Sequence, residues 1–158
     1  MHDLELFTIV LDDIKLERID ILNKKHIKAL KGLRDFKARK MCYDVKQDIR
    51  DAKKGNSDGN NFLVKRDEQY VGYMHISNDY NGKRVLSYIV QKKMRGKGLG
   101  KVMLTGVSDY LLDNGLASSV SLFVKHKNLS GNMLALSSGF EKVESNVNSG
   151  LEVYSRSK

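Results

Sequence analysis

Glycines and basic residues alternate between Val90 and Lys101, and this combination suits the binding of a phosphate group. Positions 91 to 101 hold five Lys or Arg residues and no acid. Glycines let the backbone come close to a ligand, and the first N–H groups of a helix lack partners within that helix. The helix macrodipole also favours an anion at this end. We therefore expect the segment to hold phosphate between a strand and a helix.

Two common nucleotide-binding motifs do not fit the spacing of these residues. A P-loop ending in Gly100-Lys101 would need Gly in place of Arg95 and Ser or Thr in place of Val102. A Rossmann fingerprint starting at Gly96 would need a small residue in place of Lys101, after the first strand of a parallel unit. The sequence therefore excludes both motifs at specific residues.

The run Arg95-Gly96-Lys97-Gly98-Leu99-Gly100 resembles the pyrophosphate-binding signature of the GNAT family of N-acetyltransferases. That signature is Gln or Arg, any two residues, Gly, any residue, and Gly or Ala. A second family element follows in the expected order, because Asn128, Leu134 and Gly139-Phe140 match an asparagine after the fifth strand and a helix ending in Gly-Phe. The resemblance covers residues 62–143 well and the N-terminal helices only in layout.

The resemblance implies an enzyme that uses acetyl-CoA as co-substrate and no metal. A primary amine of a small molecule or a protein would attack the thioester directly, without a covalent enzyme intermediate. The pyrophosphate would lie on the loop amides and the pantetheine would pair with the last strand residues before the loop, where an N–H would polarise the thioester carbonyl. Asn128 would bind the pantetheine arm. The implied cofactor-binding residues are Tyr88, Ile89, Val90, Arg95, Gly96, Lys97, Gly98, Leu99, Gly100, Lys101 and Asn128.

Proton transfer is the point at which the sequence departs from the family. Ala135 stands where relatives carry a tyrosine acid, and Phe123 stands where some protein-acetylating members carry a glutamate base. The remaining candidates for a catalytic acid or base are Tyr88, His126, Tyr154 and His75. Each also has a structural interpretation, as a solvated histidine, a core aromatic or a hydrogen-bonded strand residue. Catalysis by positioning alone is a further alternative.

Hydrophobic periodicity predicts the elements that must position these residues. Strands are expected at 4–10, 62–64, 70–76, 85–90 and 120–124, near Val143, and at 151–154, with helices at 18–34, 36–54, 98–113 and 129–138. This order predicts a mixed α/β fold of the GNAT type in one domain, residues 1–158. A central, mixed but mostly antiparallel sheet would be flanked by about four helices.

The net charge of +9 is concentrated in one stretch. Residues 23–54 contain 12 Lys or Arg and 4 acids, with apolar residues at helical spacing between them. Two interpretations stay open: a solvated helix face, or a surface that attracts nucleic acid, the ribosome or an acidic protein. If these helices flank the acceptor site, polyamines and aminoglycosides should be poor acceptors, because like charges repel.

Composition limits the remaining function classes. The 158 residues are 41% hydrophobic and 30% charged, which is typical of a folded domain. The lone Cys42 lies on an expected helical stripe and is interpreted as packing. No signal peptide or membrane span is recognised, so we expect a cytoplasmic monomer or homodimer. Two alternatives to catalysis remain: a degenerate acyl-CoA-binding module, and a nucleic-acid-associated or ribosome-associated protein.

Overall fold

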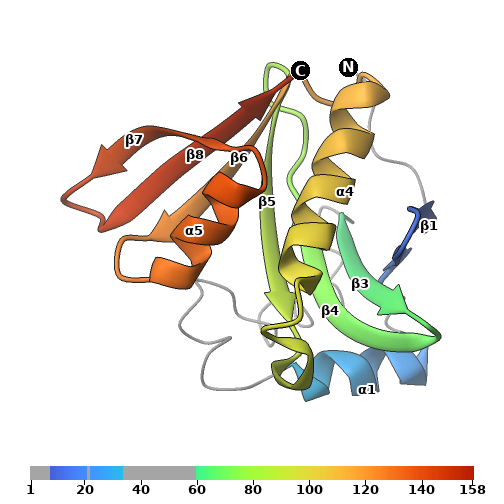
Figure 1. Cartoon of the computed structure of the whole chain (residues 1–158). Coiled ribbons are helices and arrows are strands. Elements are labelled where there is room, and N and C mark those ends of the chain that lie inside the picture. Colours follow the sequence, from blue (N-terminus) through green and yellow to red (C-terminus); the bar gives the residue numbers. More distant parts are fainter. Residues whose placement is uncertain (1–7, 21, 34–59) are drawn as a thin grey trace.

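The computed structural model describes residues 8–20, 22–33 and 60–158 (Figure 1). The elements within these ranges follow in chain order: β1 (Thr8–Val10), β2 (Lys15–Arg18), α1 (Lys24–Gly32), β3 (Asn61–Arg66), β4 (Gln69–Ile76), β5 (Lys83–Val90), the short 3-10 helix η1 (Lys92–Met94), α4 (Leu99–Asp113), β6 (Ser119–Lys125), α5 (Leu129–Ser137), β7 (Glu141–Asn146) and β8 (Leu151–Ser157).

The eight strands of the described ranges form one sheet, in the order β1-β2-β3-β4-β5-β6-β8-β7. Neighbouring strands run antiparallel except β5 and β6, which are parallel. The predicted mixed, mostly antiparallel α/β fold is therefore confirmed. Three α-helices lie within the described ranges, whereas the expected helix over 36–54 and the interpretation of Cys42 concern residues outside them.

The sheet has a different apolar cluster on each face. On one face, α4 and α5 pack against the larger cluster, which includes Leu86, Met103 and Leu122 (Figure 1). On the other face, Leu30 and Leu33 from the α1 segment pack against Leu63, Tyr73 and Ile89 of the sheet. Alternation of side chains along each strand supplies both faces from the same sequence. We call these the α4 face and the α1 face.

The predicted helix over 18–34 is wrong at its beginning. Strand β2 ends at Arg18, and α1 begins only after Asn23. Ile14 and Leu16 are buried on either side of exposed Lys15, which is the alternation of a strand. Asn23 then starts the helix, because its Oδ1 accepts hydrogen bonds from Lys25 N at 2.9 Å and His26 N at 3.4 Å.

The hydropathy and length of the described helices bear on membrane insertion. Within the ranges that the structure describes, none is long and apolar enough to cross a membrane.

Candidate functional site

Strands β5 and β6 lie side by side at one end only. Their parallel ladder joins Lys83–Val85 to Ser119–Ser121. Beyond it the strands diverge (Figure 1), while β5 stays paired with β4 as far as Val90 and β6 with β8 as far as Lys125. In the described part of the chain, the facing edges of residues 86–90 and 122–125 thus have no strand partner, and we call this region the β5–β6 split. An extended ligand can use such free backbone groups.

The loop after β5 follows a path that two of its glycines permit. Gly96 has φ +77° and Gly98 has φ +79°, in the left-handed region that other residues rarely adopt. A Cβ at either position would meet no atom within 4 Å, so backbone conformation, not crowding, is what requires glycine. Arg95 Nε donates to Val90 O at 3.0 Å, which joins the loop to the end of β5. The lysines are exposed, namely Lys92, Lys93, Lys97 and Lys101.

The helix that this loop enters begins without a side-chain cap. Gly98 occupies the N-cap of α4, and the first turn contains no acid. The N-caps of α1 and α5 are Asn23 and Asn128, whose side chains accept backbone N–H bonds. Among the three α-helices described, α4 alone therefore presents uncapped first-turn N–H groups, and it does so at the end of β5 beside basic residues. An anion suits this position.

The third glycine of the motif has a different task. A Cβ on Gly100 would lie 2.9 Å from Leu134 Cδ2, so glycine allows α4 and α5 to approach closely. The sequence motif predicts that Gly100 binds phosphate together with Gly96 and Gly98. The structure shows a packing role for its missing side chain, while its N–H belongs to the uncapped first turn.

Asn128 joins the end of β6 to the start of α5. Its Oδ1 accepts hydrogen bonds from Gly131 N at 3.0 Å and Ser130 Oγ at 3.1 Å. A Cβ on Gly131 would come within 2.5 Å of Asn128 Nδ2, so Gly131 provides the space for this amide. The carbonyl oxygen is thus used by the helix. The amide N–H groups, which donate to no described residue, are the part left to bind a ligand carbonyl.

Tyr88 lies on the split, on the α4 face. It is directly paired with Met74 of β4, and it packs against the larger core cluster. Burial raises the pKa of Tyr88 to about 12. The phenol therefore stays protonated at neutral pH, so it can donate a proton and is no base. Ala135, at the family's usual tyrosine position, is fully buried on the same face.

The candidates Tyr154 and His126 have partners outside the split. Tyr154 is fully buried on β8, and its hydroxyl donates to Asn132 Oδ1 at 2.5 Å. His126 follows β6 with its side chain 74% exposed, and its Nδ1 lies 2.8 Å from Oε1 of buried Glu152. Hydrogen bonds from His126 and Ser145 hold the pKa of Glu152 below its usual value. Because Glu152 is 26 positions away, no local pattern could reveal this pair.

His75 and Ser87 form a polar cross-strand pair that sequence analysis did not recognise. They are directly paired on β4 and β5, and His75 is paired in turn with Asn61 of β3. Ser87 lies two residues beyond the end of the β5–β6 ladder, on the α1 face of the split. Alternation along the strand 85–90 places Ser87 and Ile89 on one face and Leu86 and Tyr88 on the other. This alternation is the sequence signal that indicates the face of Ser87.

The comparison with known proteins decides the family. A model of the acetyltransferase (GNAT) family matches residues 30–140, well over half of the chain. The chain belongs to the acetyltransferase (GNAT) family. It is accordingly an acetyl-CoA-dependent N-acetyltransferase, with an acceptor that the family leaves unspecified. No curated protein matches its sequence.

Solved structures share the GNAT fold with this chain at low sequence identity. An acetyltransferase (GNAT family) from Bacillus anthracis has a TM-score of 0.77 at 13% identity, covering 95% of this chain and 98% of that one. Mutant forms of the spermidine/spermine N-acetyltransferase from Vibrio cholerae give 0.72 at 16%, covering 92% and 94%. A ribosomal L7/L12 alpha-N-protein acetyltransferase in complex with coenzyme A gives 0.69 at 11%, covering 95% and 97%. These identities are too low to transfer an acceptor.

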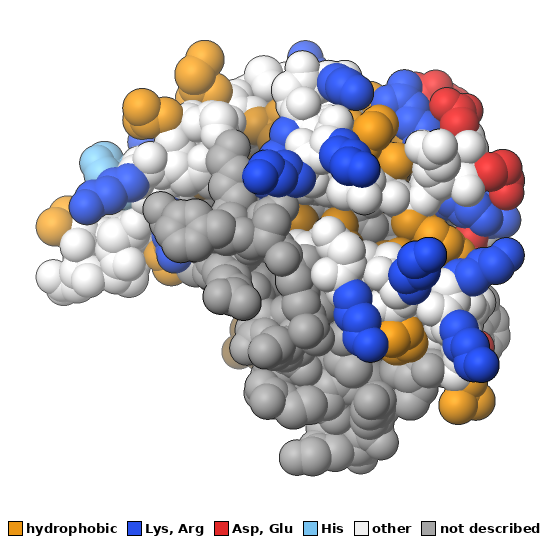
Figure 2. Space-filling view, turned by 90° about the horizontal axis from the view of Figure 1, so that it is seen from below, with side chains coloured by type: hydrophobic (Ala, Val, Ile, Leu, Met, Phe, Trp, Pro, Cys, Tyr) orange, Lys and Arg blue, Asp and Glu red, His pale blue; other side chains and the backbone are white. Residues whose placement is uncertain are grey.

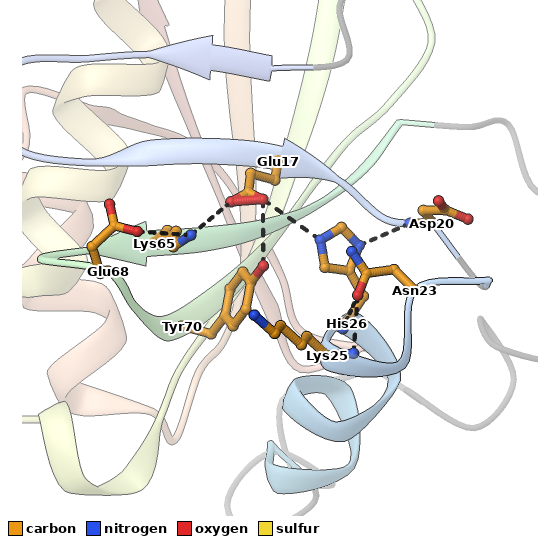
Figure 3. A network of polar contacts seen from close by, with 8 residues as sticks. All are labelled: Glu17, Asp20, Asn23, Lys25, His26, Lys65, Glu68 and Tyr70. Carbon is orange, nitrogen blue, oxygen red and sulfur yellow. Dashed lines mark hydrogen bonds and ion pairs between the residues drawn. The ribbon is translucent and has the colours of Figure 1, made fainter.

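A polar network centred on β2 fixes α1 to the sheet of this GNAT chain (Figure 3). Glu17 of β2 lies at its centre: Tyr70 Oη donates to Oε2 at 3.3 Å and Lys65 Nζ lies 3.4 Å from Oε1. His26 Nδ1 accepts from Asp20 N at 3.0 Å, so Nε2 faces Glu17 Oε2, 3.6 Å away. Burial raises the pKa of Glu17, but Lys65 and His26 outweigh it and the net shift is downward.

We expect Glu17→Gln to lower the free energy of unfolding by about 1 kcal/mol at pH 7, the usual contribution of such a hydrogen bond. Since the pKa of Glu17 is lowered in the folded state, its stabilisation is present above its unfolded pKa and is lost as pH falls through the folded value. Urea unfolding at pH 7 and pH 3.5 measures both effects. Glu68→Gln, whose side chain is 92% exposed and contacts the same Lys65, is the matched control. An equal loss in both variants, or a difference that persists at acid pH, would contradict the assignment.

Basic side chains dominate the surface around α1 and the loop. Seen from below, the molecule shows many Lys and Arg side chains and few acids (Figure 2). The exposed lysines of α1 are Lys24, Lys25, Lys28 and Lys31, from the described part of the basic stretch 23–54. Together with the loop lysines they create a positive field that favours anions.

Proposed function

We propose that residues 1–158 form one N-acetyltransferase domain that holds acetyl-CoA in the β5–β6 split. The observation that carries this proposal is the uncapped start of α4 at the end of β5, in a loop with five basic residues. The pyrophosphate would accept hydrogen bonds from the amides between Gly96 and Lys101. The pantetheine would lie along the backbone of 88–90, and the Asn128 amide would donate to it.

The reaction forms one bond and breaks another. The amine nitrogen attacks the thioester carbonyl carbon, an amide C–N bond forms, and the C–S bond breaks with its electron pair on sulfur. An ammonium acceptor loses two protons in total, of which one passes to the thiolate and the other to solvent. The free backbone N–H groups of β5 at the split would stabilise the oxyanion of the intermediate.

Tyr88 is the group that we assign to the thiolate. It lies on β5 at the split, with its side chain on the α4 face, where α5 carries Ala135 in place of the usual tyrosine. With its pKa at about 12 the phenol is protonated throughout the physiological range. It can therefore donate a proton to the departing sulfur from the opposite wall of the site.

The experiment that tests the function is thiol release from acetyl-CoA with a panel of primary amines, alongside calorimetry of acetyl-CoA binding. Thiol release that requires an amine supports the proposal. Binding without any release would indicate the degenerate acyl-CoA-binding module. Absence of binding, with a salt-dependent shift of RNA, would indicate a nucleic-acid partner for the basic residues 23–54 instead.

A further inference from the structure

Among the described helices, only α1 lies on the α1 face, where it packs over Leu63, Tyr73 and Ile89 rather than over β6. Both α4 and α5 pack on the α4 face (Figure 1). Paired residues of neighbouring strands share a face, so the pair Val85–Ser121 continues the α1 face of β5 onto β6. If acetyl-CoA occupies the split as proposed above, an amine must approach its thioester over this α1 face.

Apolar side chains cover the α1 face at the edge of the split. Phe123 of β6 is 53% exposed and directly paired with half-buried Val153 of β8. The next pair on this face joins half-buried Leu151 to exposed Lys125. Ser87 lies across the split from Phe123, each two residues beyond the last ladder pair. An acceptor nitrogen entering the split would thus meet an apolar wall on the β6 side and the Ser87 hydroxyl, with its neighbour His75, on the β5 side.

Contacts on the opposite side of the same strands verify which way these residues point. Ser145 Oγ donates to Glu152 at 2.9 Å, and Lys142 Nζ lies 5.9 Å from the Tyr154 ring centre. These four side chains therefore occupy the α4 face. Val153, which lies between Glu152 and Tyr154 along β8, must point to the α1 face with its partner Phe123.

Two charged residues of the described strands β6 and β7 are direct neighbours of this wall: exposed Glu144 is paired with Val153, and exposed Lys125 with Leu151. Glu141 and Glu144 are exposed on β7, the outermost strand, about 10 Å from β6 at two strand spacings. Lys125 lies at the tip of β6. Phe123 and Ser87, which lie on the two sides of the split itself, are uncharged, so a second ammonium group placed on Phe123 would lose water without gaining a partner.

We propose that the acceptor is a primary monoamine whose nitrogen is carried by an apolar aliphatic or aromatic group, which binds on Phe123 and Val153. Continuity of this wall with the split places the apolar group next to the thioester. Removal of apolar surface from water supplies the affinity. The position at which some relatives carry a glutamate base is, in this chain, an apolar contact for the acceptor.

The test is the kcat/KM for hexylamine and phenethylamine against that for ethanolamine, glycinamide and spermidine. We expect the two apolar amines to be better by about tenfold or more, since burying a few methylenes contributes that much. Phe123→Ala should raise KM for the apolar amines by about tenfold and for ethanolamine by less than about twofold. Phe123→Leu should restore most of the loss. Tyr80→Ala is the matched control, an aromatic that is 76% exposed in the β4–β5 turn, and it should change neither value.

The outcomes separate this inference from the function on which it rests. If no amine releases thiol from acetyl-CoA, the proposed function fails and the inference fails with it. If ethanolamine or spermidine reacts as efficiently as the apolar amines, the acceptor class is overturned while acetyl transfer stands. An equal fall in kcat/KM for every amine in Phe123→Ala would likewise overturn it.

Discussion

Replacing Gly98 by glutamate should abolish measurable binding of acetyl-CoA. A carboxylate within about 4 Å of a phosphate charge costs about 4 kcal/mol at an effective dielectric constant of 20, which is roughly a thousandfold in affinity. The new side chain meets no neighbour that would oppose it sterically, because the site of its Cβ is open. Isothermal calorimetry with acetyl-CoA measures the effect.

Gly115→Glu is the matched control for this substitution. Gly115 also has a positive φ, +67°, and open space around its Cβ, but it follows the opposite end of α4. A glutamate at position 115 therefore has the same kind of backbone strain and the same charge, but it lies away from the loop. Near-native affinity in Gly98→Glu, or an equal loss in both variants, would refute the assignment of the pyrophosphate to this loop.

Replacing Tyr88 by phenylalanine should lower kcat by about a hundredfold, the lower end of what a positioned acid contributes. The KM for acetyl-CoA should stay nearly constant, because the proton is needed only when the thiolate departs. Since burial raises the pKa of Tyr88 to about 12, wild-type kcat should show no alkaline decline from this group below pH 10. Steady-state thiol release from pH 7 to 10 measures both expectations.

Tyr154→Phe removes the same atom from another buried tyrosine. Its hydroxyl donates to Asn132, so the variant should lose about 1 kcal/mol of stability and retain kcat. Loss of kcat in Tyr154→Phe with normal turnover in Tyr88→Phe would reverse the two roles. Normal turnover in both would leave catalysis to positioning alone.

Sheet pairing explains why part of the N-terminal region was predicted wrongly. Ile19, Leu22 and Ile27 fit helical spacing, yet β2 occupies 15–18 because its backbone pairs with β3. Leu16 lies opposite Val64, and both are fully buried. A four-residue strand is too short to show a clear alternation, and its partner lies some fifty residues away. Local periodicity carries no information about that pairing.

The sequence by itself determined the family and the glycine-rich loop that we propose for the pyrophosphate. Both depend on local chemistry: glycines that permit a left-handed backbone, amides at a helix start, and basic residues next to them in the chain. The spacing from Arg95 to Gly100, and from Asn128 to Gly139-Phe140, is therefore readable without any tertiary contact.

Only the tertiary structure decided which role each of these residues has. Contact with Leu134 separates Gly100 from Gly96 and Gly98, and the pairing of Phe123 with Val153 builds the apolar wall. The His126–Glu152 pair and the three-residue ladder that opens the split also join distant segments. A sequence pattern specifies which side of its own strand or helix a residue occupies. Which side chain it meets there depends on strand order and register, which only the folded sheet fixes.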